Sequence, residues 1–204
     1  MIILDFGSGN TCKNDLNYVK RMIDELKAVD TGKHEIVIKW QLFHEAGDNT
    51  PLWLSMFSFA YEYAKGNGYK TTASVFDMPS LRYLLLFDIP FVKIANRPDL
   101  YWLAGEVPRK MPIIYSVSSG YMYELGDFEQ MLGCVSKYPA TLADYEKEFT
   151  KILLMDGISD HTTNFQLYHK YKPEIYECHY KLEDSTGLDS GDFARTPEQL
   201  KEIL

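Results

Sequence analysis

The sequence has no long apolar run and no cluster of basic residues. No stretch approaches the roughly 18 consecutive apolar residues of a membrane helix. Met1 leads into a short apolar run containing Asp5, without the basic region of a signal peptide. The net charge is −8, and neither a Lys/Arg-rich run nor zinc-finger spacing is present. We therefore expect a protein that neither crosses a membrane nor binds nucleic acid, although a few buried cations could still hold an anionic ligand.

Cysteine is scarce and unpaired in its spacing. Cys12, Cys134 and Cys178 are odd in number, far apart, and form no C-x-x-C motif. This pattern argues against a disulfide framework and predicts a reducing, cytoplasmic location. Internal repeats, low-complexity tracts and linkers are also missing. We therefore expect a single domain over residues 1–204, a length that can bury a substantial core.

Strand-like and helix-like segments alternate along the chain. Asp15–Lys27 has apolar residues at helical spacing, and Thr196-Pro197 has the form of a helix start. Alternating units predict a parallel sheet, and eight of them predict an α/β fold of the compact (β/α)8 TIM barrel type. A doubly wound open sheet is the alternative, but Gly7-Ser-Gly9 lacks the third glycine of a dinucleotide-binding turn. The expected strands are Ile2–Phe6, Glu35–Gln41, Thr71–Phe76, Phe91–Ala95, Ile113–Val117, Met131–Val135, Lys151–Met155 and Glu174–His179.

Two lysines interrupt strands that are otherwise apolar. Lys39 lies in EIVIKWQ and Lys93 in FVKIAN. A lysine inside a closed barrel is costly unless it meets an anion, so the pair is a candidate clamp for a phosphate or carboxylate. Serines at neighbouring strand ends, Ser74, Ser116 and Ser159, could complete the anion site. In an open sheet, the same ammonium groups would extend to water instead.

Two histidines occupy matched positions near the C-terminus. Gly157-Ile-Ser-Asp-His161 and Glu177-Cys-His179 each follow an apolar run, so both imidazoles are expected at the carboxyl end of neighbouring parallel strands. Two neutral imidazoles with adjacent carboxylates, Asp160 and Glu177, suit a divalent transition metal with open coordination positions. The alternative is that each histidine is a loop or core residue bonded to a backbone carbonyl.

The ordered motifs resemble those of the sialic acid synthase (N-acetylneuraminate synthase) family. Family members carry E-I-G, K-F-Q, S-T-P-F-D, F-K-I-A-S, I-L-S-T-G, C-x-x-x-Y-P, G-x-S-D-H, E-x-H-F, G-P-D-H and P-x-E-L in that order. The corresponding strings here span nearly the whole chain: Asp5-Phe-Gly7, Lys39-Trp-Gln41, Ala73-Ser-Val-Phe-Asp77, Val92-Lys-Ile-Ala-Asn96, Ile114-Tyr-Ser116, Cys134-Val-Ser-Lys-Tyr-Pro139, Gly157-Ile-Ser-Asp-His161, Glu177-Cys-His179, Gly187-Leu-Asp189 and Pro197-Glu-Gln-Leu200.

The resemblance implies a metal-dependent barrel enzyme that condenses phosphoenolpyruvate with an N-acylmannosamine-like sugar and releases phosphate. It implies that His161 and His179 hold Mn²⁺ or Mg²⁺, which polarises the acceptor aldehyde. It implies that phosphoenolpyruvate binds Lys39, Lys93 and three serines, with Ser74 in place of the family threonine. The full set of implied site residues is, for catalysis, Asp5, Lys93 and Asp189; for substrate binding, Lys39, Ser74, Asn96, Arg97, Ser116, Ser136, Tyr138 and Ser159; and for the metal, His161 and His179.

The sequence departs from the family pattern mainly on the acceptor side. Asp5 replaces a glutamate, Asn96-Arg97-Pro98 stands in place of Ser-Gly-Glu, and Ser136 replaces an asparagine. The chain ends where the antifreeze-like C-terminal domain would begin, so we expect a compact form. Two alternatives stay open: the same barrel acting on a different, phosphorylated acceptor gripped by Arg97, and a non-catalytic descendant that binds a ligand. A homodimer and a monomer are equally compatible with the sequence.

Overall fold

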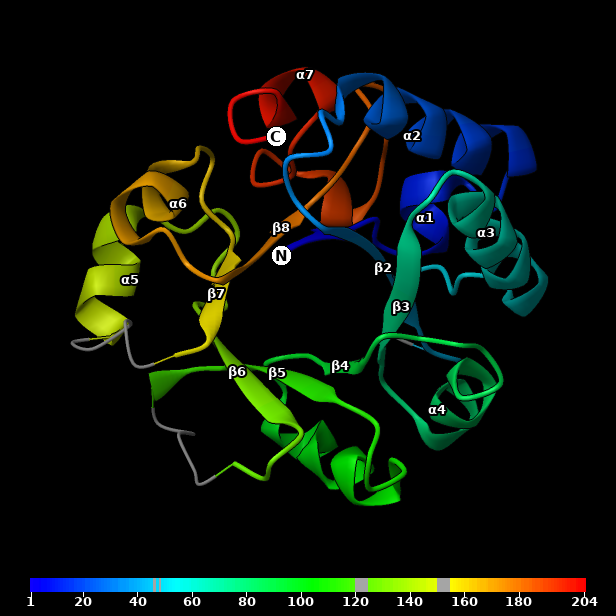
Figure 1. The fold of residues 1–204 in the computed structure, drawn as a ribbon, viewed down its shortest axis with the longest axis horizontal. Coiled ribbons are helices and arrows are strands. Elements are labelled where there is room, and N and C mark those ends of the chain that lie inside the picture. Colours follow the sequence, from blue (N-terminus) through cyan, green and yellow to red (C-terminus); the bar gives the residue numbers. More distant parts are fainter. Residues whose placement is uncertain (46, 48, 120–124, 150–154) are drawn as a thin grey trace.

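Eight parallel strands close into a barrel in the computed structural model, which describes residues 1–45, 47, 49–119, 125–149 and 155–204. Each strand pairs with the next along the chain, and the last pairs with the first (Figure 1). The predicted (β/α)8 barrel is confirmed, and the open-sheet alternative is wrong. The strands are β1 (Ile2–Asp5), β2 (Ile36–Leu42), β3 (Lys70–Val75), β4 (Val92–Ile94), β5 (Ile113–Val117), β6 (Glu129–Cys134), β7 (Gly157–Asp160) and β8 (Ile175–His179).

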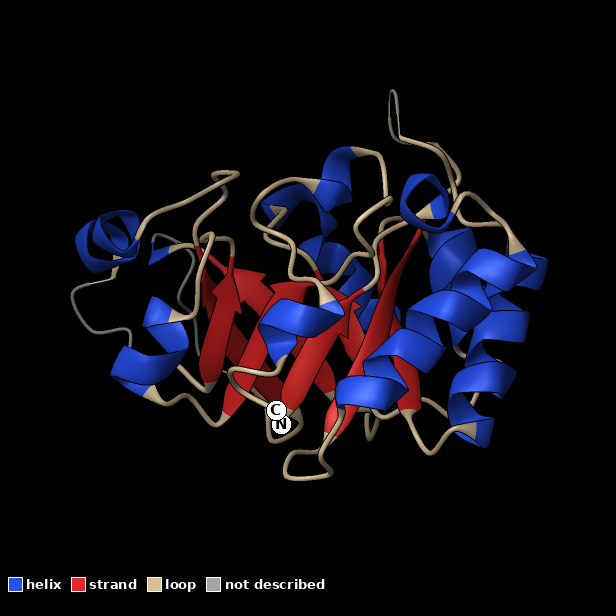
Figure 2. Ribbon diagram, turned by 90° about the horizontal axis from the view of Figure 1, so that it is seen from above, coloured by secondary structure: helices blue, strands red, loops and turns tan. Residues whose placement is uncertain are grey.

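Helices surround the barrel and connect its strands (Figures 1 and 2). Several begin with a side-chain cap: Asp77 accepts from Ser80 N, and Thr141 and Thr196 each form a capping box. The predicted start at Thr196-Pro197 is therefore confirmed. The helices are α1 (Gly9–Cys12), α2 (Leu16–Val29), α3 (Leu54–Gly66), α4 (Met78–Leu84), α5 (Leu142–Glu148), α6 (Gln166–Tyr171) and α7 (Pro197–Leu200), with 3₁₀ segments η1 (Pro98–Glu106) and η4 (Leu188–Ser190).

An apolar layer fills the barrel near the amino ends of its strands. Because strand side chains alternate between faces, the residues that point inward do so at every second position. On β2, for example, inward Val37 is followed by Lys39, so one strand supplies both the apolar layer and a polar group above it. This layer seals the barrel below the polar residues. It consists of Ile3, Val37, Phe91, Ile114, Leu132 and Ile175.

The seventh strand begins later than the sequence predicts. Lys151–Met155 was the expected strand; residues 151–154 lie outside the described residues, and Met155 lies in a bend. The strand is instead Gly157–Asp160, which pairs with β8 through Gly157 and Ile175. A Cβ at Gly157 would overlap the Ile175 carbonyl, so glycine allows the two backbones to approach closely. Gly157–Asp160, which the sequence places in the loop after the predicted strand, therefore forms β7 itself.

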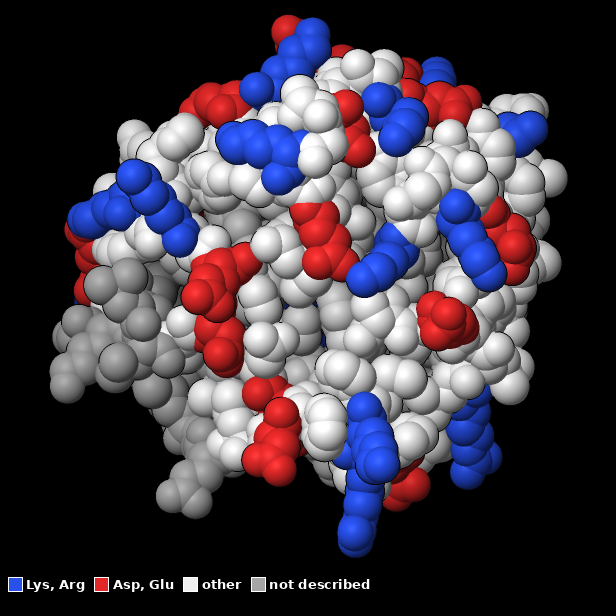
Figure 3. All heavy atoms as spheres, viewed as in Figure 1, with Lys and Arg blue, Asp and Glu red and all other residues white. Residues whose placement is uncertain are grey.

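Charged residues of both signs are interspersed on the molecular face drawn in Figure 3. Both termini lie at the end of the barrel where the strands begin (Figure 2), and the Met1 ammonium group donates to the Glu174 carbonyl. Within the described ranges, no helix has both the length and the apolar character needed to cross a membrane.

Candidate active site

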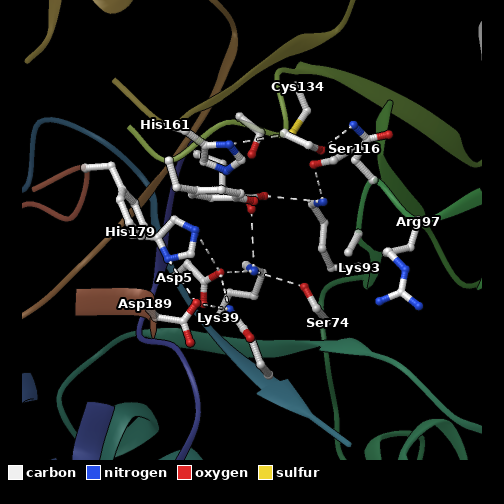
Figure 4. A pocket seen from close by; sticks show the side chains of 18 of the residues that line it. Asp5, Lys39, Ser74, Lys93, Arg97, Ser116, Cys134, His161, His179 and Asp189 are labelled. Carbon is white, nitrogen blue, oxygen red and sulfur yellow. Dashed lines mark hydrogen bonds and ion pairs between the residues drawn. The ribbon is translucent and has the colours of Figure 1, made fainter. Parts of the chain in front are cut away.

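One cavity of about 470 Å³ opens at the carboxyl ends of the strands, the end where barrel enzymes carry their active sites. All catalytic, substrate-binding and metal-binding residues that the family resemblance implies lie in its wall (Figure 4). These residues are Asp5, Lys39, Ser74, Lys93, Asn96, Arg97, Ser116, Ser136, Tyr138, Ser159, His161, His179 and Asp189. Their convergence is an observation, whereas their chemical roles stay predictions.

The first buried lysine is held by a carboxylate on the neighbouring strand. Lys39 Nζ donates to Asp5 Oδ2 at 2.6 Å and to Ser74 Oγ at 2.9 Å. Burial alone would lower the pKa of Lys39, but the charges of Asp5 and Glu177 outweigh it and the pKa is raised. The same pairing holds the pKa of the Asp5 carboxyl well below its usual range, against the opposing effect of burial. Both groups are therefore charged at neutral pH.

The second buried lysine faces the same cavity from β4. Lys93 Nζ donates to Ser116 Oγ at 2.6 Å and to the Ile94 carbonyl at 3.2 Å. Burial lowers the pKa of Lys93, and the nearby charge of Glu177 only partly offsets this effect. The Glu177 carboxylate lies between the two lysines, 3.5 Å from Lys39 Nζ and 3.6 Å from Lys93 Nζ. Because Glu177 Oε2 has no hydrogen-bond partner, this carboxylate is held by charge more than by directed bonds.

The two predicted histidines meet on the opposite side of the cavity, with ring centroids 5.5 Å apart. His161 Nδ1 lies 2.7 Å from the Val135 carbonyl oxygen, which can only accept, so this nitrogen carries the proton. Burial and the neighbouring His179 lower the pKa of His161 to about 3. The ring is therefore neutral at pH 7, and its Nε2 offers a lone pair.

A third carboxylate reaches the histidines from the loop after β8. His179 Nδ1 lies 3.5 Å from Asp189 Oδ1, and Gln41 Nε2 donates to that oxygen at 2.9 Å. Gly7 makes room for this loop because a Cβ there would come within 2.9 Å of the Asp189 Cβ. Burial raises the pKa of Asp189, so a proton on this carboxyl costs less than on an exposed one.

The residues fit a divalent metal held by two imidazoles with other positions open. Across the described ranges, no group of three or more His, Cys, Asp or Glu side chains is placed to hold a metal ion. His161 nevertheless has the arrangement of a metal-binding imidazole, with one nitrogen donating to a carbonyl and the other free. His179 Nδ1 and Asp189 Oδ2 are buried without hydrogen-bond partners. An ion held mainly by His161 and His179 would keep positions for water or substrate.

The rim residues that depart from the family pattern are engaged with the protein itself. Asn96 Nδ2 donates to Ser136 Oγ at 3.0 Å, and its Oδ1 accepts from Ser118 N at 3.2 Å. The Arg97 guanidinium group makes two hydrogen bonds to the Asp99 carboxylate, at 2.9 and 2.7 Å. Asn96 thus ties the ends of β4, β5 and β6 together. Arg97 can meet a ligand only by leaving or sharing Asp99.

One predicted metal neighbour points away from the site. Asp160 was expected beside His161, but its carboxylate accepts from Tyr176 Oη at 2.6 Å and from Thr162 N at 2.7 Å, outside the cavity. The expectation is wrong because alternate residues of β7 face opposite sides, and Ser159 and His161 take the inner side. Glu177 by contrast does face the cavity.

Some cavity residues were not assigned to the site from the sequence. Gln41 and Glu177 lie at strand ends, where the sequence indicates polar residues, but neither was given a substrate-binding or catalytic role. Phe193 could not be identified from the sequence, because it lies in a loop without a motif; its ring centroid is 4.9 Å from that of His179 and 5.0 Å from that of Tyr138. The other additions are Phe76, Ala95, Cys134 and Leu188. Burial raises the pKa of Cys134 to about 12, which argues against a thiolate nucleophile.

Solved structures with the same barrel include enzymes of sugar-acid synthesis. An N-acetylneuraminic acid (sialic acid) synthetase from Leptospira borgpetersenii superposes with a TM-score of 0.75 at 22% identity, over 98% of this chain and 80% of that one. The chain has the fold of a sialic acid synthetase. The resemblance that the ordered motifs indicate is thus confirmed at the level of the fold.

Two further structures agree with this fold. A spore coat polysaccharide biosynthesis protein E from Chromobacterium violaceum has a TM-score of 0.81 at 18% identity, covering 98% of this chain and 71% of that one. A phospho-2-dehydro-3-deoxyheptonate aldolase (DAHP synthase) from Thermotoga maritima has a TM-score of 0.64 at 11% identity, covering 99% and 66%. No protein-family model and no curated protein matches the sequence.

Proposed function

We propose that this chain is a sialic acid synthase-like enzyme, one cytoplasmic domain that condenses phosphoenolpyruvate with an aldose. The products would be a sialic-acid-type 2-keto-3-deoxy sugar acid and phosphate. In this reaction, C3 of phosphoenolpyruvate bonds to the aldehyde carbon, the aldehyde oxygen takes a proton, water adds to C2, and phosphate leaves. The enzyme would be a carbon–carbon bond-forming transferase of carbohydrate biosynthesis.

The observation that carries this proposal is the placement of two buried lysines opposite two histidines across one cavity. Lys39 and Lys93 supply charge for an anion, and His161 and His179 supply nitrogen ligands for a metal in the same cavity (Figure 4). A condensation of this kind needs an anionic donor and an aldehyde acceptor held in contact. A cavity with an anion-binding side and a cation-binding side supports that arrangement.

The donor side would bind phosphoenolpyruvate through charge-assisted hydrogen bonds. Lys39 and Lys93 would hold its anionic groups, with hydroxyls from Ser74, Ser116 and Ser159 completing the contacts. A bound anion would compete with Glu177 for both ammonium groups. Asp5 would stay paired with Lys39 and keep it charged and fixed in place.

The acceptor side would be built around the histidines. A divalent Mn²⁺ or Mg²⁺ ion bound by His161 and His179 would act as a Lewis acid. Asp189, whose pKa is raised by burial, would deliver a proton to the aldehyde oxygen. The Tyr138 ring covers His161, with ring centroids 4.2 Å apart, and would shield this side from water.

Arg97 at the cavity rim favours a second class of acceptor, a phosphorylated aldose. Arg97 lines the cavity, and an acceptor with a phosphate group could replace Asp99 as its partner. Turnover of phosphorylated aldoses alone would support this class, whereas turnover of neutral N-acylhexosamines would support the first. A barrel that only binds its ligand would turn over neither.

The direct test is phosphate release from phosphoenolpyruvate with Mn²⁺ over a panel of N-acylated, plain and phosphorylated aldoses. We expect release that depends on one acceptor and a product whose mass equals both substrates plus water minus phosphate. Lys93→Met should abolish the reaction. Release without any acceptor would indicate a phosphatase, and no release combined with no phosphoenolpyruvate binding would refute the proposal.

The metal proposal has its own test. We expect the double variant His161→Ala/His179→Ala to lose Mn²⁺ binding while keeping its fold, because both nitrogen ligands are removed. Calorimetric titration of Mn²⁺ measures the affinity, and circular dichroism checks the fold. Equal Mn²⁺ affinity in the wild type and the double variant would refute the metal site.

A further inference from the structure

A buried arginine behind the cavity has no part in the site described above. Arg195 lies in the segment between η4 and α7, and only 1% of its surface is exposed. Its backbone N donates to the His179 carbonyl at 2.8 Å, and its carbonyl accepts from Lys181 N at 2.9 Å. The residue is therefore attached directly to the end of β8, where His179 lies. A guanidinium group buried at such a position is costly unless its donors are used.

The guanidinium group donates to backbone carbonyls of two different loops. Its Nη1 donates to the Phe193 carbonyl at 2.8 Å, and its Nη2 donates to the Asn164 carbonyl at 2.7 Å. Asn164 lies three residues after His161, and Phe193 lies in the loop that covers His179. The central carbon of the guanidinium group lies over the Phe165 ring, 4.9 Å from its centroid. One side chain thus links the loop after His161 to the loop that covers His179.

The carboxylate nearby does not account for this bonding. Arg195 Nη2 lies 3.7 Å from Asp160 Oδ2, beyond hydrogen-bond distance, and that oxygen already accepts from Tyr176. An arginine serving only to neutralise Asp160 would place its paired donors on the carboxylate. Here the short contacts go to carbonyl oxygens, so the geometry indicates a tether between loops.

Phe193, one of the two residues whose carbonyl Arg195 binds, contacts the rings of the candidate metal site. Phe193 packs edge-on against His179, with centroids 4.9 Å apart, and lies 6.3 Å from the His161 ring. A shift of the Phe193 backbone would therefore move a ring that contacts both imidazoles. Side chains behind ligating histidines commonly set ligand orientation, and their loss costs about 10- to 100-fold in metal affinity.

We propose that Arg195 is a positioning residue that holds the loops after His161 and His179 together, so that both imidazoles face one cavity. The proposal rests on the proposed function only for the identity of the ligand that the imidazoles bind. Arg195 itself does not line the cavity. It acts through the Phe193 and Asn164 backbones.

The test compares Arg195→Met with Arg195→Lys and with the control Arg21→Met, which removes an exposed arginine paired with Asp184. Mn²⁺ and phosphoenolpyruvate affinities are measured by calorimetry, and unfolding is followed separately. We expect Arg195→Met to weaken Mn²⁺ binding about 10- to 100-fold and to leave phosphoenolpyruvate binding unchanged, because the lysines lie across the cavity. Arg195→Lys keeps the charge but loses the two-carbonyl fork, so we expect an intermediate loss. Arg21→Met should change neither affinity.

A second measurement does not depend on metal or substrate. Imidazole ¹⁵N resonances report which ring nitrogen of His161 carries the proton. We expect one Nδ1-protonated form of His161 in the wild type and a mixture of forms, or a broadened signal, in both Arg195 variants. If Arg195→Met does not fold, Arg195→Lys alone supplies this comparison. Lower thermal stability with unchanged Mn²⁺ affinity and an unchanged His161 signal would overturn the proposal. A wild type that binds neither Mn²⁺ nor phosphoenolpyruvate would refute the proposed function, and the resonance measurement would still decide the role of Arg195.

Discussion

Two lysines of this chain make ion pairs of nearly equal length in opposite surroundings. Lys39 Nζ lies 2.6 Å from Asp5, with 3% of each side chain exposed, and Lys70 Nζ lies 2.7 Å from Glu35, with 62% and 51% exposed. Burial therefore differs while distance does not. Replacing each lysine by methionine compares the contribution of a buried lysine, with its further contacts to Ser74 and Glu177, with that of an exposed one to the free energy of unfolding.

The expected magnitudes follow from this geometry. At the 2.6 Å of the buried pair, an effective dielectric of about 20 gives an attraction of about 6 kcal/mol, from which the desolvation of both ions must be subtracted. Lys39→Met leaves Asp5 as a buried charge without its lysine, so we expect a loss of about 3–5 kcal/mol at pH 7. Lys70→Met should cost about 0–1 kcal/mol because water screens the exposed pair.

The dependence on pH has a definite sign. In the wild type, the pKa of Asp5 is lowered, so the pair contributes stability above the unfolded carboxyl pKa of about 3.9 and loses it as pH falls. In Lys39→Met, burial dominates and raises the pKa of Asp5, so the carboxyl can fold in its neutral form. The difference between wild type and Lys39→Met should therefore shrink as pH falls from 7 to below about 4.

Urea unfolding of the wild type and both variants, at pH 7 and in acid, measures these free energies. The double variant Lys39→Met/Asp5→Asn is the further control, and it should recover most of the loss because the Asp5 position no longer carries a charge and Glu177 keeps Lys93 as its partner. Equal destabilisation by Lys39→Met and Lys70→Met at pH 7 would refute the reasoning. So would a Lys39→Met loss that grows in acid.

Other predictions test the backbone, the thiol and one buried hydroxyl. Gly157→Ala should lower the free energy of unfolding by about 1–3 kcal/mol because the new methyl group overlaps the Ile175 carbonyl, whereas Gly66→Ala, which meets open space, should be neutral or stabilising in urea unfolding. Cys134, buried and with its pKa raised to about 12, should resist iodoacetamide at pH 7 until the protein unfolds, and rapid labelling detected by mass spectrometry would contradict this. Tyr145→Phe removes a buried hydroxyl that donates to the Ser159 carbonyl of β7 and accepts from His161 N, so we expect the free energy of unfolding to fall by about 1–3 kcal/mol. An unchanged midpoint in urea would contradict a stabilising role for these two hydrogen bonds.

The candidate site was predictable where it depends on strand ends. In a parallel barrel, the last inward residues of all strands meet at one end. Lys39, Lys93, His161 and His179 could therefore be brought together from the chain alone, without knowledge of any contact. These residues lie on strands as far apart in the sequence as β2 and β8, and closure of the barrel brings their side chains into one cavity.

What a side chain touches could not be predicted in the same way. Asp160 directly precedes His161, whereas Glu177 lies two residues before His179, and in the structure Asp160 faces away from the cavity while Glu177 faces it. The start of β7 is a separate matter, because it lies where Gly157 approaches Ile175 of β8 and not in the apolar run before it. A shift of one residue reverses every side chain of a strand.

The sequence by itself determined the alternation of strands and helices, the closed barrel, and the residues expected at its carboxyl end. Hydrophobic periodicity and the order of segments along the chain can both be read from the sequence without knowledge of any contact. Only the tertiary structure decided the partners: Asp5 for Lys39, Ser136 for Asn96, and the two loop carbonyls for Arg195. These contacts join segments from distant parts of the chain. Their geometry depends on how strands and loops pack together, which no local pattern encodes.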